Sequence, residues 1–157
     1  MNSVSTCLWF NDEALEAAEF YCGIFPNSYI LDAQRYLEGA PKPAGSVLTV
    51  RFTLDGTEFM TINGSPEYPF TPAISLVANC HTQQELDRLW QALGDGGKPG
   101  QCGWLTDRYG VSWQIVPQQL LRFIASDDKA AAQRAFNALM GMSKLDIEAL
   151  QRAFDGT

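Results

Sequence analysis

Residues 100–117, "GQCGWLTDRYGVSWQIVP", decide the fold, because they join a turn to a strand whose side chains alternate in polarity. The run Asp107–Gly110 is typical of a tight turn, since aspartate suits its first position and glycine tolerates positive φ. Side chains two apart on a strand share a face, which gives two sets: Val111, Trp113 and Ile115, then Ser112, Gln114 and Val116. We predict a hairpin whose apolar set packs beneath a helix and whose Gln114 set lines a cavity.

The segment before this hairpin predicts a strand followed by a helix. Residues 73–80, "AISLVANC", form the strand. Thr82 and Glu85 form a capping box that opens a helix with one apolar stripe, and Gly94 ends it. Residues 73–117 therefore form a β-rich module built around one helix.

Residues 4–63 predict the same arrangement, β-α-β-β-β. Residues 11–13, Asn-Asp-Glu, supply an N-cap and first-turn acids for the helix. Asp55-Gly56 is a strong hairpin signal, because both turn positions tolerate positive φ. The expected strands are 4–10, 29–36, 46–54 and 57–63.

The two modules superpose with an offset of 69 residues, which pairs Thr6 with Ser75 and Tyr21 with Trp90. The side chains differ, so the pattern is repeated rather than the sequence. A helix that covers one face of each sheet leaves the other face free to line a cavity.

Residues 118–157 change in character and predict two or three helices. Ser126 suits an N-cap, Gly141 a stop, and Ser143 begins a second capping pattern. The apolar residues of these helices need a surface to cover them, either in the other half of the molecule or in a second subunit. We expect a homodimer, and truncation after Pro117 is expected to cause aggregation or monomerisation.

Charge and composition exclude several classes of partner. The chain is 46% hydrophobic with a net charge of −7, which fits one globular domain and argues against nucleic acid, whose binding needs clustered Lys and Arg. No apolar run is long enough for a membrane span, and no signal peptide is expected. The four cysteines lack CxxC spacing, so we expect buried thiols in a cytoplasmic protein.

Three stretches resemble the PhnB-like branch of the vicinal oxygen chelate superfamily, often labelled 3-demethylubiquinone 3-methyltransferase-like: 6–28, 100–117 and 127–154. The resemblance implies an α+β fold in which two βαβββ modules, about 4–63 and 73–117, form a cupped mixed sheet of the glyoxalase/bleomycin resistance type. Residues 1–117 would be the paired modules and residues 118–157 a helical extension of the same domain. Such proteins are often dimers with a metal-binding or ligand-binding cavity inside the cup.

The residues disfavour the methyl transfer named by that label. Common S-adenosylmethionine enzymes place a glycine-rich turn between a strand and the helix that follows. Here the glycine-rich residues 94–103 follow a helix and precede a strand.

Metal-dependent relatives carry His or Glu on four strands that face the cavity. In this sequence the resemblance places Thr6, Ser75 and Gln114 at three of these positions, and Phe59 or Thr61 at the fourth. Neutral hydroxyl and amide groups do not replace the imidazoles and carboxylates that divalent metals need. We therefore expect no metal and no other cofactor, although a divalent metal is possible if ligands enter from another subunit.

Alternation along the strands predicts a cavity that mixes hydroxyls, amides and apolar groups, which suits an uncharged or weakly polar organic ligand. His81, the lone histidine, is expected to be an exposed residue near the helix cap. The candidate ligand-binding residues are Thr6, Leu8, Thr61, Asn63, Ser75, Trp104 and Gln114.

These observations favour a small-molecule-binding protein of the superfamily without the metal site. The alternative is a superfamily enzyme of the lyase, isomerase or dioxygenase type that acts on a small organic substrate. Two further hypotheses are methyl transfer and a structural role in which the helical tail is a docking surface. The sequence alone leaves open whether any reaction is catalysed.

Overall fold

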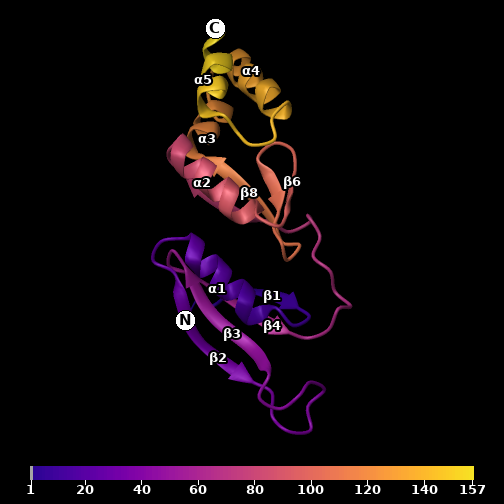
Figure 1. Ribbon diagram of the computed structural model, residues 1–157. Coiled ribbons are helices and arrows are strands. Elements are labelled where there is room, and N and C mark those ends of the chain that lie inside the picture. The colour runs from indigo at the N-terminus through magenta and orange to yellow at the C-terminus, as the bar shows by residue number, and fades with distance from the viewer. Residues whose placement is uncertain (1) are drawn as a thin grey trace. The chain divides into compact units, whose positions relative to one another are not determined.

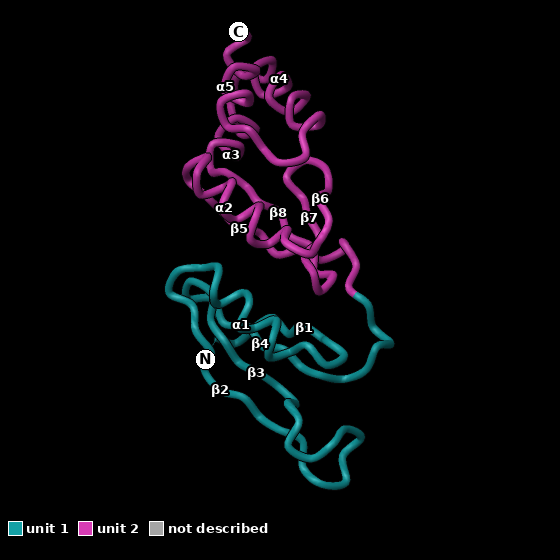
Figure 2. The backbone as a smooth tube through the Cα atoms, in the orientation of Figure 1, with its two compact units in different colours: residues 1–69 teal, residues 70–157 magenta. Residues whose placement is uncertain are grey.

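The computed structural model describes residues 2–157, which form eight strands and five helices (Figure 1). The chain divides into two compact units, one up to Pro69 and one from Phe70 on (Figure 2). The boundary falls between the two predicted modules, and residues 118–157 belong to the second unit.

The first unit is a βαβββ module. Its elements are β1 (Thr6–Phe10), α1 (Ala14–Ile24), β2 (Tyr29–Arg35), β3 (Val47–Leu54) and β4 (Thr57–Asn63). The strand order is β1-β4-β3-β2, with β1 parallel to β4 and the other pairs antiparallel. Helix α1 lies over this sheet (Figure 1), and Tyr21, Val50 and Phe52 are fully buried in its core.

The second unit repeats the module and adds three helices. Its elements are β5 (Leu76–Cys80), α2 (Gln83–Gly94), β6 (Lys98–Pro99), β7 (Trp104–Thr106), β8 (Ser112–Pro117), α3 (Gln118–Ile124), α4 (Lys129–Met140) and α5 (Ile147–Asp155). The order β5-β8-β7-β6, with β5 parallel to β8, matches that of the first sheet. The predicted α+β class with paired βαβββ modules and C-terminal helices is therefore confirmed.

The apolar set of the opening hairpin packs beneath a helix, as its alternation predicts. Trp113 and Ile115 are almost completely buried, and Leu86, Leu89 and Leu93 of α2 are buried with them. The βαβββ pattern implies three strands after α2, but the residue pattern located only two; the structure places the remaining one, β6, at two residues, one of them proline. So short a segment shows no period of its own.

Two hairpin turns have the conformation that their sequences predict. Asp55 and Gly56 both have positive φ, at 45° and 82°. Gly110, with φ of 89°, ends the turn between β7 and β8, and its N–H donates to the carbonyl of Asp107 at 3.0 Å.

Helix starts agree only in part with the prediction. Thr82 caps α2 as expected and accepts from the N–H of Glu85. Helix α1, however, is not capped by a side chain of residues 11–13; the N–H of Ala14 instead donates to Oδ1 of Asn63 on β4, at 2.9 Å. The caps of α4 and α5 are Asp128 and Asp146 rather than Ser126 and Ser143, because these carboxylates lie directly before the first helical turn.

The three added helices are tied to the second module by backbone hydrogen bonds. The N–H groups of Cys102 and Gly103 donate to the carbonyls of Met142 and Ser143, both at 2.8 Å. Leu145 is 1% exposed, and Phe123 stacks on Phe154 with ring centroids 5.0 Å apart. Much of the apolar surface of the tail is thus covered within its own unit.

All four cysteines are free thiols, but only Cys80 is buried and Cys7 is exposed. The expectation of buried cysteines is therefore wrong for Cys7, which lies on the side of β1 away from α1. Within residues 2–157, no helix has the length and apolar character needed to cross a membrane.

Candidate functional site

Three of the predicted ligand-binding residues come together on the face of the second sheet that α2 does not cover. Gln114 on β8 donates a hydrogen bond from Nε2 to Oγ of Ser75, next to β5, at 2.9 Å. Trp104 on β7 lies directly opposite Gln114 in the antiparallel register. All three side chains are partly exposed. We call this group the Ser75–Gln114–Trp104 cluster.

The cluster lies on an open face whose neighbouring side chains are neutral apart from Lys98. Val77 is opposite Gln114 in the parallel pair, and Thr106 is opposite Ser112. Lys98, on the edge strand β6, lies on the same side and is exposed. The arrangement offers an amide and a hydroxyl beside a flat indole, and so combines hydrogen bonding with stacking.

The first unit does not place the predicted residues on its open face, and this assignment is corrected. Thr61 is fully buried, and its Oγ1 donates to the carbonyl of Ala14 in α1 at 3.0 Å. Leu8 is opposite Thr61 and is 5% exposed. Asn63 caps α1. These three side chains therefore lie on the face that α1 covers, and Thr6, partly exposed, lies on the same side of β1.

The error comes from one residue in a turn. The helices begin 69 residues apart, at Ala14 and Gln83, but the first strands begin 70 apart, at Thr6 and Leu76. Three residues join β1 to α1, whereas two join β5 to α2. Because side chains alternate along a strand, a shift of one residue moves every side chain to the opposite face. Aligning the ends of the strands, rather than the helices, would have given the right face.

The open face of the first unit holds residues that the sequence did not suggest. Met60, opposite Cys7, takes the place that Gln114 has opposite Val77. Trp9 donates from Nε1 to the carbonyl of Ser65 at 2.9 Å, and its ring meets Tyr68 edge-on at 5.3 Å.

A charged network lies on the same face of the first unit. Arg51 bridges Asp32 at 2.8 Å and Glu58 at 3.1 Å. The first unit therefore presents aromatic and charged groups, whereas the second presents the neutral cluster.

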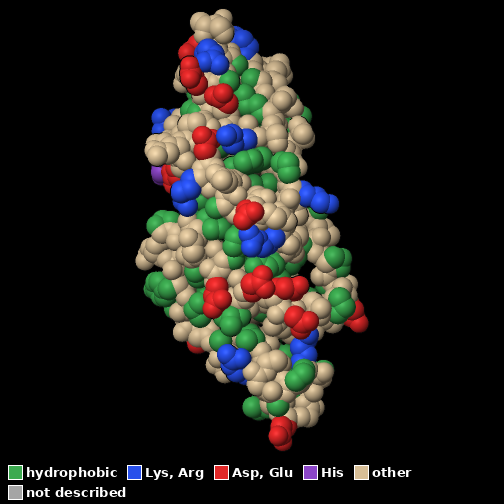
Figure 3. All heavy atoms as spheres, viewed as in Figure 1, with side chains coloured by type: hydrophobic (Ala, Val, Ile, Leu, Met, Phe, Trp, Pro, Cys, Tyr) green, Lys and Arg blue, Asp and Glu red, His purple; other side chains and the backbone are tan. Residues whose placement is uncertain are grey.

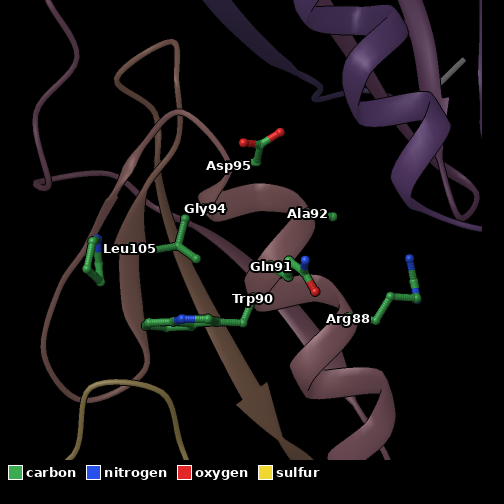
Figure 4. Close-up of a pocket in the computed structure, with 8 residues that line it drawn as sticks. Arg88, Trp90, Gln91, Ala92, Gly94, Asp95 and Leu105 are labelled. Carbon is green, nitrogen blue, oxygen red and sulfur yellow. The ribbon is translucent and has the colours of Figure 1, made fainter.

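The second unit also contains a pocket of about 690 Å³ away from the cluster (Figure 4). It lies beside the C-terminal half of α2, where the Trp90 ring extends from the helix and Leu105 faces the pocket from β7. Its polar residues Arg88, Gln91 and Asp95 are exposed, and Asp95 pairs with Arg108 at 2.9 Å. None of the predicted ligand-binding residues is among those that line it.

Two other residues named in the sequence analysis, His81 and Asp107, make hydrogen bonds that support the local structure. His81 is exposed, as expected, and its backbone N–H donates to the carboxylate of Glu85 at 2.8 Å. Asp107 is 3% exposed, and its carboxylate accepts from the N–H groups of Tyr109 and Val111 and from Nε1 of Trp113. These bonds build the β7–β8 turn.

Comparison with known proteins decides the family. The 3-demethylubiquinone-9 3-methyltransferase family matches residues 2–116. The chain belongs to this family. A PhnB protein from Bacillus cereus is 37% identical, with 74% of this chain and 99% of that protein covered, and a TM-score of 0.69. The resemblance to PhnB-like proteins is thereby confirmed.

A structure from Pseudomonas aeruginosa shares the fold of this family member, with 23% identity, 74% of this chain and 98% of that one covered, and a TM-score of 0.60. No curated protein matches the chain. Both structural matches span nearly all of the related protein and leave about a quarter of this chain unmatched.

For this member of the methyltransferase family, the glycines of residues 94–103 have a packing role. A Cβ at Gly97 would lie 2.1 Å from the carbonyl oxygen of Thr106, and one at Gly100 would lie 2.9 Å from that of Trp104. The glycines allow the β6–β7 backbones to approach each other. Their presence therefore has an explanation that involves no methyl donor.

The residues of the cluster do not fit the divalent metal that the superfamily implies. Ser75 and Gln114 are neutral, and the amide nitrogen of Gln114 is already directed at the hydroxyl of Ser75. Zinc and other first-row metals are held by thiolates, imidazoles and carboxylates. Across residues 2–157, no group of three or more His, Cys, Asp or Glu side chains is arranged to hold a metal ion.

Proposed function

We propose that this family member binds a small, uncharged organic molecule on the open face of its second unit, without a metal ion. The observation that carries the proposal is the hydrogen bond between Gln114 and Ser75 at 2.9 Å beside the partly exposed ring of Trp104. Paired amide and hydroxyl groups next to an aromatic ring are typical of sites that orient an organic ligand.

The cluster has hydrogen-bonding capacity left for a ligand. After one N–H of Gln114 is used on Ser75, the amide keeps its oxygen and a second N–H, and the hydroxyl of Ser75 keeps its hydrogen. The cluster can therefore both donate to and accept from a carbonyl, hydroxyl or amide of the ligand. The three side chains of the cluster carry no charge, and Lys98 lies on the edge strand β6 rather than in the cluster, so we expect the part of the ligand that meets the cluster to be neutral.

Catalysis is the second candidate function, and the site does not specify which reaction it would be. The alternative is a lyase, isomerase or dioxygenase acting on a small organic substrate, and it needs a base or metal ligand that the cluster does not supply. We also propose a homodimer in the cytoplasm, which the four free thiols support because disulfides are rare in that compartment.

Binding of an organic molecule can be tested without knowing the natural ligand. A library of neutral aromatic carbonyl compounds is screened by ligand-observed NMR against the wild-type protein, with chelator present throughout. We expect ligands whose signals disappear with Gln114→Ala and Ser75→Ala but persist with Thr61→Ser, which alters the covered face of the first unit. Failure to find any such ligand would contradict the proposal.

Metal and methyl-donor binding are tested separately. Elemental analysis of untagged protein incubated with zinc, iron, nickel and manganese is expected to show no stoichiometric metal. Calorimetry with S-adenosylmethionine is expected to show no binding. A bound metal would favour the enzyme reading, and measurable affinity for the methyl donor would favour the activity in the family's name.

A further inference from the structure

Trp104, the aromatic member of the cluster, directly follows a turn with an unusual backbone conformation. Cys102 and Gly103 lie in this turn, with positive φ angles of 59° and 85°. A residue other than glycine rarely adopts such a conformation, and it persists only where the surrounding structure holds the chain in place. We call residues 100–103 the β6–β7 turn. Its conformation sets the direction in which the Trp104 side chain leaves the backbone.

The connection between α4 and α5 holds this turn. The N–H of Cys102 donates to the carbonyl of Met142 at 2.8 Å. The N–H of Gly103 donates to the carbonyl of Ser143 at 2.8 Å, and the Ser143 hydroxyl donates to the carbonyl of Gly100. These hydrogen bonds fix the backbone of the turn at three of its four residues.

An apolar contact adds to these hydrogen bonds. Leu145 is 1% exposed, and a Cβ added to Gly103 would lie 3.1 Å from its Cδ1. The Leu145 side chain therefore covers the turn at the residue that precedes Trp104. We call residues 142–145 the tail segment.

The tail segment is itself attached to the start of α2. Nε2 of Gln83 donates to the carbonyl of Leu145 at 3.0 Å, and Oε1 of Gln83 accepts from the N–H of Ile147 at 2.8 Å. Lys144 forms an ion pair with Asp87 at 3.0 Å. The segment is thus anchored to the same module whose turn it supports.

Charge does not oppose this attachment. Residues 118–157 hold five acidic and five basic side chains, and residues 70–117 hold four acidic and three basic ones. Figure 3 shows both signs of charge over α4 and α5. Because the charges are nearly balanced in both parts, net repulsion between them is small. The attachment therefore depends on the hydrogen bonds and on the contact made by Leu145.

Trp104 connects the β6–β7 turn to the cluster. Its N–H donates to the carbonyl of Gln101 at 3.0 Å, and its carbonyl accepts from the N–H of Gly100 at 2.8 Å. On the neighbouring strand it lies opposite Gln114. A movement of the turn therefore changes the position of the indole relative to the amide of Gln114.

We propose that the tail segment positions Trp104 for ligand binding at the Ser75–Gln114–Trp104 cluster, with Ser143 as a positioning residue. The inference rests on the function proposed above. Ser143 acts through Gly100 and the turn and does not itself touch the ligand. The family match ends at residue 116, so the support for the site comes from a segment outside the matched modules.

Titration with benzamide tests the inference, with the tightest ligand of the screen as the probe if benzamide does not bind. The phenyl ring can stack on Trp104, and the carboxamide can both accept from and donate to Gln114. The indole signal of Trp104 in a ¹H–¹⁵N spectrum follows binding. Ser143→Ala is expected to raise the Kd about fivefold, because the turn loses one of its hydrogen bonds. Ser143→Thr keeps the hydroxyl and should restore the wild-type Kd.

Lys144→Ala is the matched control. Lys144 belongs to the same segment, but it pairs with Asp87 of α2 and makes no hydrogen bond to the turn. Its replacement should leave the Kd unchanged, even if the melting temperature falls. Amide hydrogen exchange gives a readout without ligand, in which Gly103 and Trp104 should exchange faster in Ser143→Ala than in Lys144→Ala. Leu145→Val, which reduces the apolar contact, carries the same test if Ser143→Ala does not fold.

The outcomes separate this inference from the proposed function. An equal Kd in the wild type and Ser143→Ala, or equal losses of affinity in Ser143→Ala and Lys144→Ala, would overturn the positioning role and leave the proposed binding site intact. A wild-type protein that binds neither benzamide nor any compound of the screen would overturn the proposed function, and this inference with it.

Discussion

Gln114 and Ser75 are joined by a hydrogen bond of 2.9 Å that crosses from β8 toward the edge strand β5 on the open face of the second unit. In the first unit Met60 takes the place of Gln114, and its thioether cannot make the hydrogen bond that the amide of Gln114 makes. The repeated fold therefore supplies two open faces, of which only the second carries a neutral hydrogen-bonding pair. Divergence between the two modules, rather than the fold itself, concentrates the proposed binding site in one unit.

Asn63 is predicted to stabilise the fold rather than to bind ligand. Its Oδ1 accepts from the first N–H of α1, and its Nδ2 donates to the carbonyl of Val47 at 3.1 Å. Asn63→Ala should lower the free energy of unfolding by about 1–2 kcal/mol, since a helix cap and a second bond are lost. Urea denaturation measures the loss, and the affinity for any ligand of the second unit should not change.

Asp107 should be among the most sensitive carboxylates of the chain. It is 3% exposed and accepts three hydrogen bonds, one of them from Nε1 of Trp113 at 2.9 Å. Asp107→Ala leaves buried donors without a partner and should cost about 2–4 kcal/mol of stability. Asp95→Ala is the control, because its ion pair with Arg108 is exposed and should change stability by less than about 1 kcal/mol. Equal losses in the two variants would contradict this account.

The glycines before β7 should be required for packing. Gly97→Ala would place a Cβ 2.1 Å from a backbone oxygen, so β6 and β7 must separate and the melting temperature should fall. Gly23→Ala is the matched control, since nothing lies within 4 Å of its Cβ and it sits in α1. That change should stabilise the protein by roughly 0.5–1 kcal/mol. Thermal unfolding of both variants checks the contrast.

Thiol reactivity should distinguish Cys80 from Cys7. Burial, and then the charge of Glu85, raise the pKa of Cys80 from 9.0 to about 11. Burial also raises the pKa of Cys7, but Cys7 is exposed whereas Cys80 is buried, so Cys80 should resist alkylation in the folded protein and Cys7 should react before it. Mass spectrometry of partly alkylated protein identifies the order. Rapid labelling of Cys80 under native conditions would show that β5 is not covered as described.

The same pKa shift predicts a loss of stability in alkali. The unfolded chain releases the Cys80 proton near pH 9.0, while the folded protein holds it until about pH 11. The contribution of the Cys80 thiol to the free energy of unfolding is thus complete below pH 9.0, and it is lost as the pH rises through 11. Urea midpoints across this range should fall more steeply for the wild type than for Cys80→Ala. An equal fall of the urea midpoint with pH in the two proteins would contradict the raised pKa of Cys80.

The sequence predicts the elements of this fold well because their signals are local. The Asp55-Gly56 turn, the Thr82 cap and the alternation around Trp113 each depend on neighbouring residues, and the structure confirms all three. The cap of α1 could not be predicted in this way, since Asn63 lies 49 residues from Ala14 along the chain.

The candidate site was predictable in the second module and not in the first. Alternation divides a strand into two faces but does not say which one a helix covers when both contain apolar residues. Leu8 and Trp9 illustrate the difficulty, because either could belong to the core. The single extra residue between β1 and α1 determines which face of β1 the helix covers.

The most direct test of ligand binding at the Ser75–Gln114–Trp104 cluster is the indole region of a ¹H–¹⁵N NMR spectrum during titration with a neutral ligand from the screen. The chain has four tryptophans, so four indole signals report four places. The account predicts that the Trp104 signal shifts while that of Trp113, which is bonded to Asp107 on the covered face, does not. A shift of Trp90 alone would place the ligand in the pocket beside α2, and no shift of Trp104 would contradict the proposed site.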